Sequence, residues 1–482
     1  MRMSIRGGLR LDSHKARPLQ RPIRVVPPPT LLALALDQGS GEDAHPRVLP
    51  GTRVQLGQLV ASAHGAAAAL HSPVSGVVRE IALRPAARGT GLCIVIENDG
   101  RDERAASLAP ADWLSLDGAE LLALIAAGGA AGLGGAAFPT ATKLALGRAT
   151  GAELLLLNGA ECEPWICCDD ALMRERAADV VLGAQVMIAA AGCQRCIIAI
   201  EDDKPAAIAA IESAVNHAGD ARIAVLALPA VFPLGAEGPL VAAVTGREVP
   251  HDGLPPQAGV VVQNVATAAA VARLARDGLP LVSRIVTVTG GGVREPANVE
   301  ARLGTPVADL VAACGGYGAA DVRHIAGGSL TGRELPGATV PLTKGLNCVL
   351  VATAADLPAR APEQPCIRCG DCATACPVGL LPQQLHLATR SNDATGLARY
   401  GLSACIECGC CDYVCPSAIP LTARFQAARE RQHLQDAARQ RALDARARFE
   451  RHQRRLAERA AAERRAFDDA RRRARGPEPG AD

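Results

Sequence analysis

Nine of the 17 cysteines lie between residues 366 and 415, and their spacing suits the chemistry of metal–sulfur clusters. Two segments of this region, CIRCGDCATACP and CIECGCCDYVCP, share the pattern CxxCxxCxxxCP. Three thiolates separated by two residues each can bind successive irons of a cubane, while a fourth, before a turn fixed by proline, is directed to another cluster. The pattern predicts two [4Fe-4S] clusters, which transfer one electron at a time.

The ligands of each cluster are assigned across both motifs, because the last cysteine of each motif is placed for the cluster of the other. The first cluster takes Cys366, Cys369, Cys372 and Cys415, and the second takes Cys405, Cys408, Cys411 and Cys376. Cys410 is interpreted as a non-ligand, and the cysteines outside this region lack metal-ligand spacing. Zinc is the alternative metal, since paired CxxC units also form zinc ribbons, but the repeated three-plus-one spacing favours iron–sulfur clusters.

A glycine-rich loop, GLGGAAFPTATK at residues 132–143, is the second feature that could do chemistry. Glycines allow the backbone to approach a phosphate or a planar ring, and the amides at the start of a following helix can bind the anion. The segment NGAECEPWICCDD begins at Asn158, directly after an apolar run, and its Glu161 and Glu163 flank a cysteine. These segments together indicate a flavin or nucleotide pocket. Solvated surface carboxylates are the alternative interpretation of the two acids.

The composition is that of a globular protein with several domains. Of the 482 residues, 49% are hydrophobic and 21% are charged, which excludes a disordered or collagen-like chain. The formal net charge is +2 and aromatic residues make up only 2%, so the sequence predicts no nucleic-acid partner. The charge is unevenly placed, because residues 421–482 contain 17 arginines against 10 acidic residues, a net charge of +7.

No segment has the features of a secretory signal or a membrane anchor. The N-terminal residues MRMSIRGGLRLDSHK are charged throughout and contain no apolar stretch of signal-peptide length. Two uncharged runs, residues 121–142 and 253–272, are too rich in alanine, glycine, proline or side-chain amides to span a bilayer. We expect no signal peptide, no transmembrane helix and a reducing compartment, where clustered cysteines bind metal more often than they form disulfides.

Apolar runs and turns divide the chain into five predicted parts, a multidomain α/β plus β architecture. Residues 1–105 are predicted to form strands and turns, and VLPGTRVQLGQLVASA with HSPVSGVVREIAL resembles the two halves of a lipoyl-type barrel-sandwich module. The hairpin between the halves, SAHGAAAALHS, lacks the lysine that carries biotin or lipoate in carrier proteins. We therefore expect an unmodified, structural module, with any other small β domain as the alternative.

The remaining four parts follow from the same patterns. Residues 106–280 alternate alanine-rich segments with the apolar runs ELLLLN, RCIIAIE, RIAVLALP and GVVVQNV, which is typical of an α/β domain with a parallel sheet. Residues 281–355 are a small β-rich module, and a proline-rich linker leads into the cysteine domain at residues 356–420. The tail, residues 421–482, is helical by propensity. A solvated helix is its default interpretation, and a docking helix is the alternative.

The motifs also resemble those of known proteins. GxGGAxFPTxxK followed by NxxExEP is similar to the flavin-binding subunit of respiratory complex I, in which both segments line a shared FMN and NADH pocket. The chain further resembles the C subunit of the Rnf electron-transport complexes, in the order GLGGAAFPTATKL, NGAECEPWICCDDALM, FPLGAEGPLVAAVTGREVP, QNVATA, ARLGTPV and the two cysteine motifs. This resemblance runs from about Gly7 to Pro420, and it implies a β-grasp, ligand-binding-like fold for residues 281–355.

The resemblance implies roles for individual residues. Glu161 and Glu163 would be the catalytic residues, which hold the nucleotide or a water beside the flavin, and Glu237 is a weaker nucleotide candidate. The implied cofactor-binding residues are Gly132, Gly134, Gly135, Ala136, Phe138, Lys143, Asn158 and Asn264. Ala137 stands where that family usually has glycine.

The implied function is electron transfer within an ion-translocating membrane complex. Because hydride transfer moves two electrons and a cubane accepts one, a flavin between them is required. We expect non-covalent FMN and two [4Fe-4S] clusters as cofactors, NADH as substrate, and a peripheral position on the cytoplasmic face of the bacterial inner membrane. The expected partners are the other subunits of the complex and ferredoxin or flavodoxin. The alternatives are an iron–sulfur scaffold subunit without flavin, and the flavin subunit of a soluble hydrogenase or formate dehydrogenase.

Overall fold

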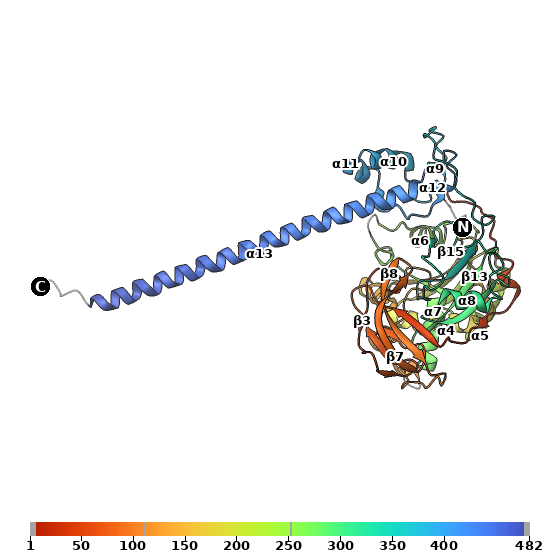
Figure 1. Ribbon diagram of the computed structural model, residues 1–482, viewed down its shortest axis with the longest axis horizontal. Helices are drawn as coiled ribbons and strands as arrows, with labels where there is room; N and C mark the ends of the chain where they lie inside the picture. Colours follow the sequence, from red (N-terminus) through yellow and green to blue (C-terminus); the bar gives the residue numbers. More distant parts are fainter. Residues whose placement is uncertain (1–5, 110–111, 251–252, 477–482) are drawn as a thin grey trace. The chain divides into compact units, whose positions relative to one another are not determined.

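The computed structural model describes residues 6–109, 112–250 and 253–476 (Figure 1). The chain folds into two compact units. Met1–Gln384 with Ala404–Leu421 form the first unit, and Leu385–Ser403 with Thr422–Asp482 form the second. All nine clustered cysteines therefore belong to the first unit. The boundaries of the five parts expected from the sequence stay predictions.

The N-terminal region of the first unit consists of two antiparallel sheets, with strand orders β2-β8-β7-β4 and β3-β5-β6 (Figure 1). The strands are β2 (Leu31–Ala35), β3 (His45–Pro46), β4 (Arg53–Val54), β5 (Leu59–Ser62), β6 (Leu70–His71), β7 (Gly76–Ala86) and β8 (Gly89–Asn98). Side chains from both sheets, among them Leu34, Val60 and Ile94, are fully buried in one core. The strand-and-turn character expected for this region is confirmed.

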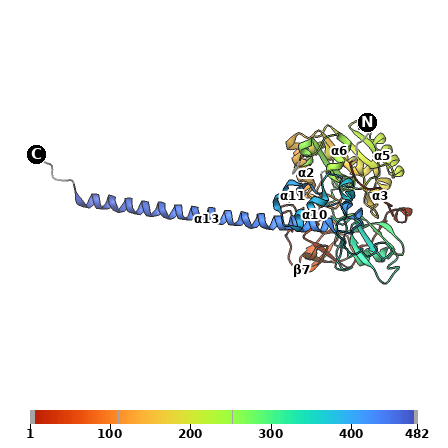
Figure 2. The same ribbon diagram turned by 90° about the horizontal axis from the view of Figure 1, so that it is seen from above.

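A four-stranded parallel sheet organises the next region, with the strand order β11-β10-β9-β12. The strands are β9 (Leu154–Gly159), β10 (Arg195–Glu201), β11 (Ile223–Leu228) and β12 (Val260–Asn264), which coincide with the four apolar runs of the sequence. The helices are α1 (Gly118–Ala127), α2 (Thr140–Thr150), α3 (Cys168–Glu175), α4 (Ala177–Ala191), α5 (Pro205–Ala218), α6 (Glu237–Thr245) and α7 (Val265–Asp277) (Figure 2). Leu154–Leu157 is buried throughout, as expected for a strand covered on both faces.

The third region of this unit is a six-stranded mixed sheet with the order β1-β14-β13-β17-β15-β16. Its elements are β1 (Arg24–Val25), β13 (Ser283–Thr289), β14 (Ala297–Arg302), α8 (Val307–Ala313), β15 (Arg323–Ala326), β16 (Arg333–Glu334) and β17 (Cys348–Ala352). β1 comes from the N-terminal segment and pairs with β14, where Arg24 is opposite Val299. The N-terminal segment therefore pairs with a strand that lies 275 residues later in the sequence, from Arg24 to Val299, a pairing that local patterns do not predict.

Short helices complete the first unit. They are α9 (Asp371–Thr374) and α12 (Cys410–Tyr413) within the cysteine motifs, and the 3-10 helices η1 (Pro18–Gln20), η2 (Trp113–Ser115) and η3 (Pro255–Ala258).

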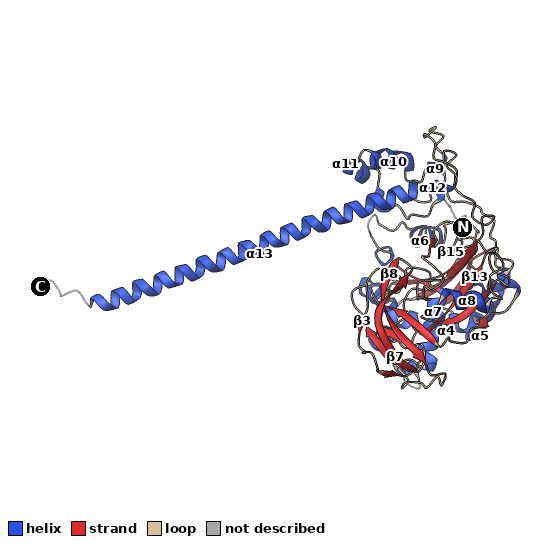
Figure 3. Cartoon of the chain, in the orientation of Figure 1, coloured by secondary structure: helices blue, strands red, loops and turns tan. Residues whose placement is uncertain are grey.

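The second unit is helical (Figure 3). Its residues lie largely in α10 (Pro382–Arg390), α11 (Ala394–Arg399), the 3-10 helix η4 (Leu402–Ala404) and α13 (Leu421–Arg475), of which Pro382–Gln384, Ala404 and Leu421 belong to the first unit. Phe425 of α13 is buried, and Arg429 donates hydrogen bonds to the carbonyl oxygens of Leu402 and Ser403, each at 3.0 Å. α13 confirms the helix that the sequence predicted for the tail. Among the described helices, none combines the length and the apolar character needed to cross a bilayer.

Candidate functional site

The glycine-rich loop is closed by its own backbone. The amide of Gly132 donates to the carbonyl oxygen of Phe138 at 2.9 Å, and the amide of Ala137 donates back to Gly132 at 3.0 Å. Ala137 has a φ of +49°, a left-handed conformation that costs a non-glycine residue roughly 1 to 2 kcal/mol. Ala137 nevertheless adopts the left-handed conformation that the loop requires at this position, and its methyl group is buried.

Three consecutive amides of the loop are available to a ligand. Within residues 6–109, 112–250 and 253–476, the amides of Gly134, Gly135 and Ala136 have no hydrogen-bond partner. Gly135 has a φ of +121°, and a Cβ placed there would meet no atom within 4 Å. α2 begins after this loop, and its N-cap residue Pro139 supplies no side-chain cap. Free amides, open space and an uncapped helix N-terminus fit an anionic, planar group such as FMN.

Two asparagines lie at the carboxyl ends of neighbouring strands, where open α/β sheets bind ligands. Asn158 of β9 is paired in register with Asn264 of β12. The Asn158 side chain donates to the carbonyl oxygen of Gly235 at 2.7 Å. Asn264 caps α7 and donates to Asp169 Oδ2 at 2.5 Å, and its amide nitrogen would lie 3.4 Å from a Cβ at Gly134. Asn264 thus adjoins the glycine-rich loop, and the hydrogen bonds of Asn158 and Asn264 stabilise this edge of the sheet.

The loop is continued by Phe138, which is exposed, and by Lys143 of α2. The Lys143 ammonium forms an ion pair with the carboxylate of Glu237, the first residue of α6. This pair connects the two helices and brings together two residues that the sequence suggested separately.

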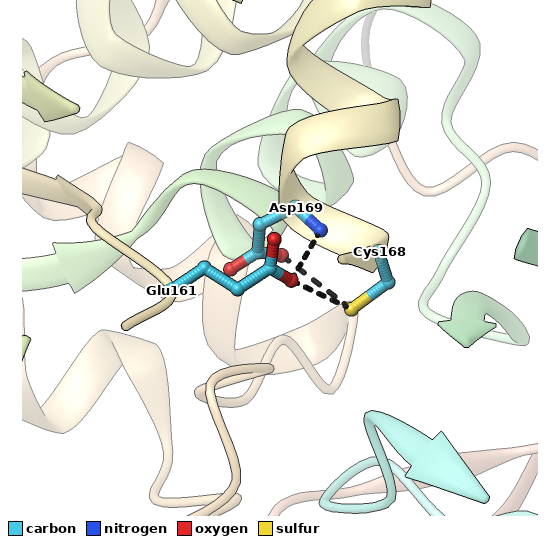
Figure 4. Close-up of side chains that lie close together, drawn as sticks. All are labelled: Glu161, Cys168 and Asp169. Carbon is cyan, nitrogen blue, oxygen red and sulfur yellow. Dashed lines mark hydrogen bonds between the residues drawn. The ribbon is translucent and has the colours of Figure 1, made fainter. Parts of the chain in front are cut away.

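Glu161 lies at the N-terminus of α3 (Figure 4). Its carboxylate accepts hydrogen bonds from the backbone amides of Asp169 and Asp170 at 2.8 and 3.0 Å, and from Cys168 Sγ at 3.5 Å. The N-cap residue Cys167 provides no side-chain cap, so Glu161 supplies this function from outside the helix. The carboxylate predicted to hold a nucleotide is therefore engaged with backbone donors.

Glu161, Cys168 and Asp169 form a compact group whose ligating atoms all lie within 4.8 Å of one another. Burial raises the pKa of Glu161, and the charge of Lys15 opposes this shift. Burial and then the charge of Glu161 raise the pKa of Asp169 to about 7. The sequence did not indicate this grouping, because the three residues share no recognised metal-ligand spacing.

Glu163 connects the acidic segment to the loop between β15 and β16. Its carboxylate accepts hydrogen bonds from the amides of Leu330 at 3.0 Å and Thr331 at 2.8 Å, and from the Thr331 hydroxyl. The carbonyl oxygen of Leu330 would lie 3.4 Å from a Cβ at Gly409 in the second cysteine motif. Leu330, Cys162, Cys408 and Cys410 share one apolar cluster. The acidic segment and the second motif therefore meet across this loop.

An N-terminal segment, residues 8–15, connects the same regions. The amide of Gly8 donates to the carbonyl oxygen of Ala375 at 3.0 Å, between the last two cysteines of the first motif. His14 stacks on Trp165 with ring centroids 4.3 Å apart, and the buried Lys15 donates to the carbonyl oxygen of Glu161. Sequence reasoning missed this segment. Its one chemical signal is Lys15, one of only four lysines in the chain.

The two cysteine motifs are a structural repeat, since equivalent residues lie 39 positions apart. α9 in the first motif corresponds to α12 in the second. Residues with left-handed backbone recur at equivalent positions: Arg368 and Glu407, Gly370 and Gly409, Gly379 and Ala418. The two loops therefore have the same conformation, although only some of the residues involved are glycine.

The two cysteine motifs lie against each other. α9 contacts α12, and Ala375 of the first motif packs with Cys408 and Cys410 of the second. Burial raises the pKa of Cys372 and of Cys376, and each shift has a smaller contribution from a thiol of the other motif, Cys415 and Cys408 respectively. This arrangement and the soft thiolate donor set fit two iron–sulfur clusters.

Four family models match successive parts of the chain. They are the RnfC barrel sandwich hybrid domain at residues 3–101, the Nuo51 FMN-binding domain at 125–273, the SLBB domain at 285–334 and the 4Fe-4S dicluster domain at 365–419. The order of modules expected from the sequence is confirmed, as are the FMN-binding and iron–sulfur domain types. A crystal structure of an NAD+-reducing [NiFe]-hydrogenase aligns with a TM-score of 0.47 and 19% identity over 65% of this chain and 62% of that chain.

Curated relatives match nearly the whole chain. It is 44% identical to the C subunit of the ion-translocating oxidoreductase complex of Pseudomonas aeruginosa, over 95% of this chain and 60% of that protein. The chain thus spans less than two-thirds of that relative. It is 42% identical to the protein of the same name from Rhodobacter capsulatus, over 88% of this chain and 82% of that protein. The resemblance expected from the motifs is confirmed, and the chain belongs to the family of C subunits of ion-translocating oxidoreductase complexes.

Proposed function

We propose that this chain is a peripheral subunit of an ion-translocating oxidoreductase complex, in which it passes electrons between NADH and ferredoxin through FMN and two [4Fe-4S] clusters. The other subunits of the complex and ferredoxin or flavodoxin are its partners, on the cytoplasmic face of the bacterial inner membrane. One observation carries the proposal. The acidic segment beside the glycine-rich loop meets the second cysteine motif through Glu163 and Leu330, so the flavin and cluster sites adjoin within one unit.

The residues of the α/β region would hold the flavin. Bound FMN accepts the two electrons of a hydride and releases them singly, as clusters require. The amides of Gly134, Gly135 and Ala136 and the N-terminus of α2 offer donors to its anionic part. Gly132 and Ala137 fix the loop, and Asn158 and Asn264 hold the adjoining edge of the sheet.

The remaining predicted residues complete the proposed pocket. Phe138 is an exposed aromatic side chain at the end of the loop, and Lys143 contributes positive charge balanced by Glu237. Backbone hydrogen bonds fix the carboxylates of Glu161 and Glu163 in the acidic segment; we propose that Glu161 orients the nucleotide or a water, and that Glu163 positions the loop between β15 and β16. The crossed ligand sets, Cys366, Cys369, Cys372 and Cys415, and Cys405, Cys408, Cys411 and Cys376, hold the clusters.

The competing function is an iron–sulfur scaffold subunit with clusters but no flavin. The three free amides, which are exposed beside the uncapped N-terminus of α2, and the open space at Gly135 favour the flavin-binding function, because such donors bind an anionic group. Flavin, iron and sulfide content of one anaerobic preparation separates the two. We expect about one FMN and about eight irons per chain. Iron without flavin, even after titration with FMN, would favour the scaffold function.

A matched pair of variants makes this experiment specific. Gly135→Phe places a ring in the open space at a strained φ, so it should abolish FMN retention and NADH-driven dye reduction while iron content is preserved. Gly151→Phe is the control, because Gly151 is also left-handed with open space around it, but it ends α2 at the other side of the helix. Equal flavin loss in both variants would contradict the assignment of the loop.

A further inference from the structure

The long helix α13 leaves its side chains uncovered over most of its length. Of residues 431–474, all are exposed except Gln432 and Ala447, which are partly buried. Four large apolar side chains along one face are among the exposed residues, with exposed fractions of 62% for Phe449 and 68% for Phe467. A helix that is surrounded only by water does not require apolar side chains at these positions, so their arrangement along the helix indicates what could cover it.

The exposed apolar residues follow an 11-residue period. Leu434, Ala445, Leu456 and Phe467 recur at this interval, and Ala438, Phe449 and Ala460 lie four residues after the first three. Because 11 residues make close to three turns, these positions form a straight stripe along one face. Arg441, His452, Glu463 and Arg471 interrupt the stripe between Leu434 and Ala474. The tail therefore presents an apolar line about as long as the exposed helix itself.

Charged residues are sorted around this stripe. At about 100° per residue, arginines border it on both sides. On the 11-residue period, the rows directly beside the stripe hold Arg448 and Arg459 on one side and Arg464 on the other, and no acidic residue. Of the acidic residues, Asp436, Glu450, Glu458 and Asp469 lie on the opposite face, and Asp444 and Asp468 lie at its edges. The apolar half of the helix therefore carries seven arginines against three acidic residues.

We propose that residues 434–474 of α13 bind flat on an anionic lipid surface. In this arrangement the stripe enters the boundary between headgroups and acyl chains, and the bordering arginines pair with lipid phosphates while their stems cover apolar surface. A second copy of the helix fits less well, because pairing two stripes would bring arginine borders together. The guanidinium geometry suits phosphate oxygens, which accept two parallel hydrogen bonds.

Vesicle binding of the full-length holoprotein tests the proposal. We expect co-sedimentation with phosphatidylcholine vesicles that contain phosphatidylglycerol, at least about tenfold weaker binding to phosphatidylcholine alone, and a comparable loss at high salt. Equal binding to both vesicle types would overturn the role of the arginine borders. Absence of vesicle binding, with tail-dependent retention on membranes that contain the whole complex, would identify a protein partner and overturn the lipid assignment.

The two faces of α13 supply matched variants. Leu456→Ser lies in the stripe and Leu443→Ser lies away from it, although both side chains are about half exposed, at 45% and 51%. Only Leu456→Ser should weaken vesicle binding severalfold. Tryptophan at the same positions gives a second readout: Leu456→Trp fluorescence should shift to shorter wavelength with phosphatidylglycerol vesicles, and Leu443→Trp fluorescence should not. Equal behaviour of the two positions would overturn the proposed orientation.

Discussion

Glu163 is a single side chain that serves two regions of the first unit. Its carboxylate accepts hydrogen bonds from the amides of Leu330 and Thr331 and from the Thr331 hydroxyl, and Leu330 in turn lies against the second cysteine motif at Gly409. A carboxylate with three such donors is fixed in position. We therefore interpret Glu163 as a positioning residue, which sets the loop between the proposed flavin site and the second cluster.

Substitution of Glu163 by glutamine should separate positioning from nucleotide binding. Glu163→Gln maintains the shape but loses the charge, so the free energy of unfolding should fall by roughly 1 to 2 kcal/mol, at the lower end because the carboxylate is partly exposed. FMN and iron content should be preserved, and reduction of the clusters by NADH should be slower in stopped-flow absorbance. Glu212→Gln, at an exposed site on α5, is the control. Weaker nucleotide binding with unchanged cluster reduction would contradict this interpretation.

The acid pair at α3 gives a pH dependence with a defined sign. Burial and the charge of Glu161 raise the pKa of Asp169 to about 7, far above the value of about 3.9 expected in the unfolded chain. Between these values the folded state binds the additional proton, so the Asp169 contribution to stability is lost as pH rises towards 7. The largest slope that one such group can add is about 1.4 kcal/mol per pH unit.

Asp169→Asn should remove this slope. The variant cannot ionise at this position, so its free energy of unfolding relative to the wild type should increase from about pH 4 to about pH 7 and then level off. Urea unfolding at a series of pH values measures the difference. Burial raises the pKa of Glu201 to about 7, so Glu201 contributes its own decrease of stability with pH in both the wild type and the variant. Asp309→Asn, on α8, should leave the slope unchanged, and the same result for Asp169→Asn would disprove the shift.

At the scale of elements, the strands of the parallel sheet could be predicted because the apolar run that forms each strand is a local feature of the sequence. The run at Leu154–Leu157 is apolar at every position, and a strand buried on both faces requires this. The pairing of β1 with β14 could not be predicted, since it joins residues 275 positions apart and β1 has only two residues. Propensity carries no information about such distant partners.

The candidate site was predicted in its parts but not in its contacts. The glycine-rich loop was found because its conformation depends on its own residues, among them Gly135. The role of Glu161 as a cap was missed because the helix it serves begins seven residues later, at Cys168. One local signal was available: no serine, threonine, aspartate or asparagine stands at the N-cap of α3, so another side chain had to supply the cap.

The repeat of α9 and α12 leads to a prediction about ligand sets. If the ligands are crossed, Cys376→Ala should perturb chiefly the cluster of Cys405, Cys408 and Cys411, and the other cluster should remain visible by electron paramagnetic resonance. Cys410→Ala is the matched control within the same motif. It should preserve both clusters, with about eight irons per chain, because a non-ligand thiol contributes only packing. Loss of a cluster in Cys410→Ala would overturn the assignment.

At the scale of the whole molecule, one buried lysine ties together three regions of the first unit. Lys344 Nζ donates to the carbonyl oxygens of Ala69 in the N-terminal module and Gly129 after α1, both at 2.7 Å. Lys344 itself precedes β17 of the six-stranded sheet. Burial lowers the pKa of Lys344 to about 7. The barrel sandwich and FMN-binding modules are therefore both joined to the loop before β17 by specific hydrogen bonds within this unit.

The tail should be separable from electron transfer. The predicted cofactor residues all precede residue 416, and the buried side chains of α13, Leu421, Phe425 and Ala428, precede residue 431. Deletion of residues 431–482 should therefore leave iron content, FMN content and NADH oxidation by an artificial acceptor unchanged. Salt-sensitive recovery with membranes should fall, as measured by fractionation. Loss of iron in the truncated protein would show that the tail contributes to folding of the cysteine motifs.

The contact between Gly8 and Ala375 has a consequence for biosynthesis. The ribosome makes Gly8 well before its hydrogen-bond acceptor Ala375, which is polymerised roughly 20 to 70 s later at ordinary rates of translation. His14 and Lys15 meet their partners Trp165 and Glu161 earlier in that interval, but Gly8 still has no native acceptor. The contact of Gly8 can form only after the first cysteine motif has emerged, so this docking step and the delivery of iron and sulfide fall in the same late phase of synthesis.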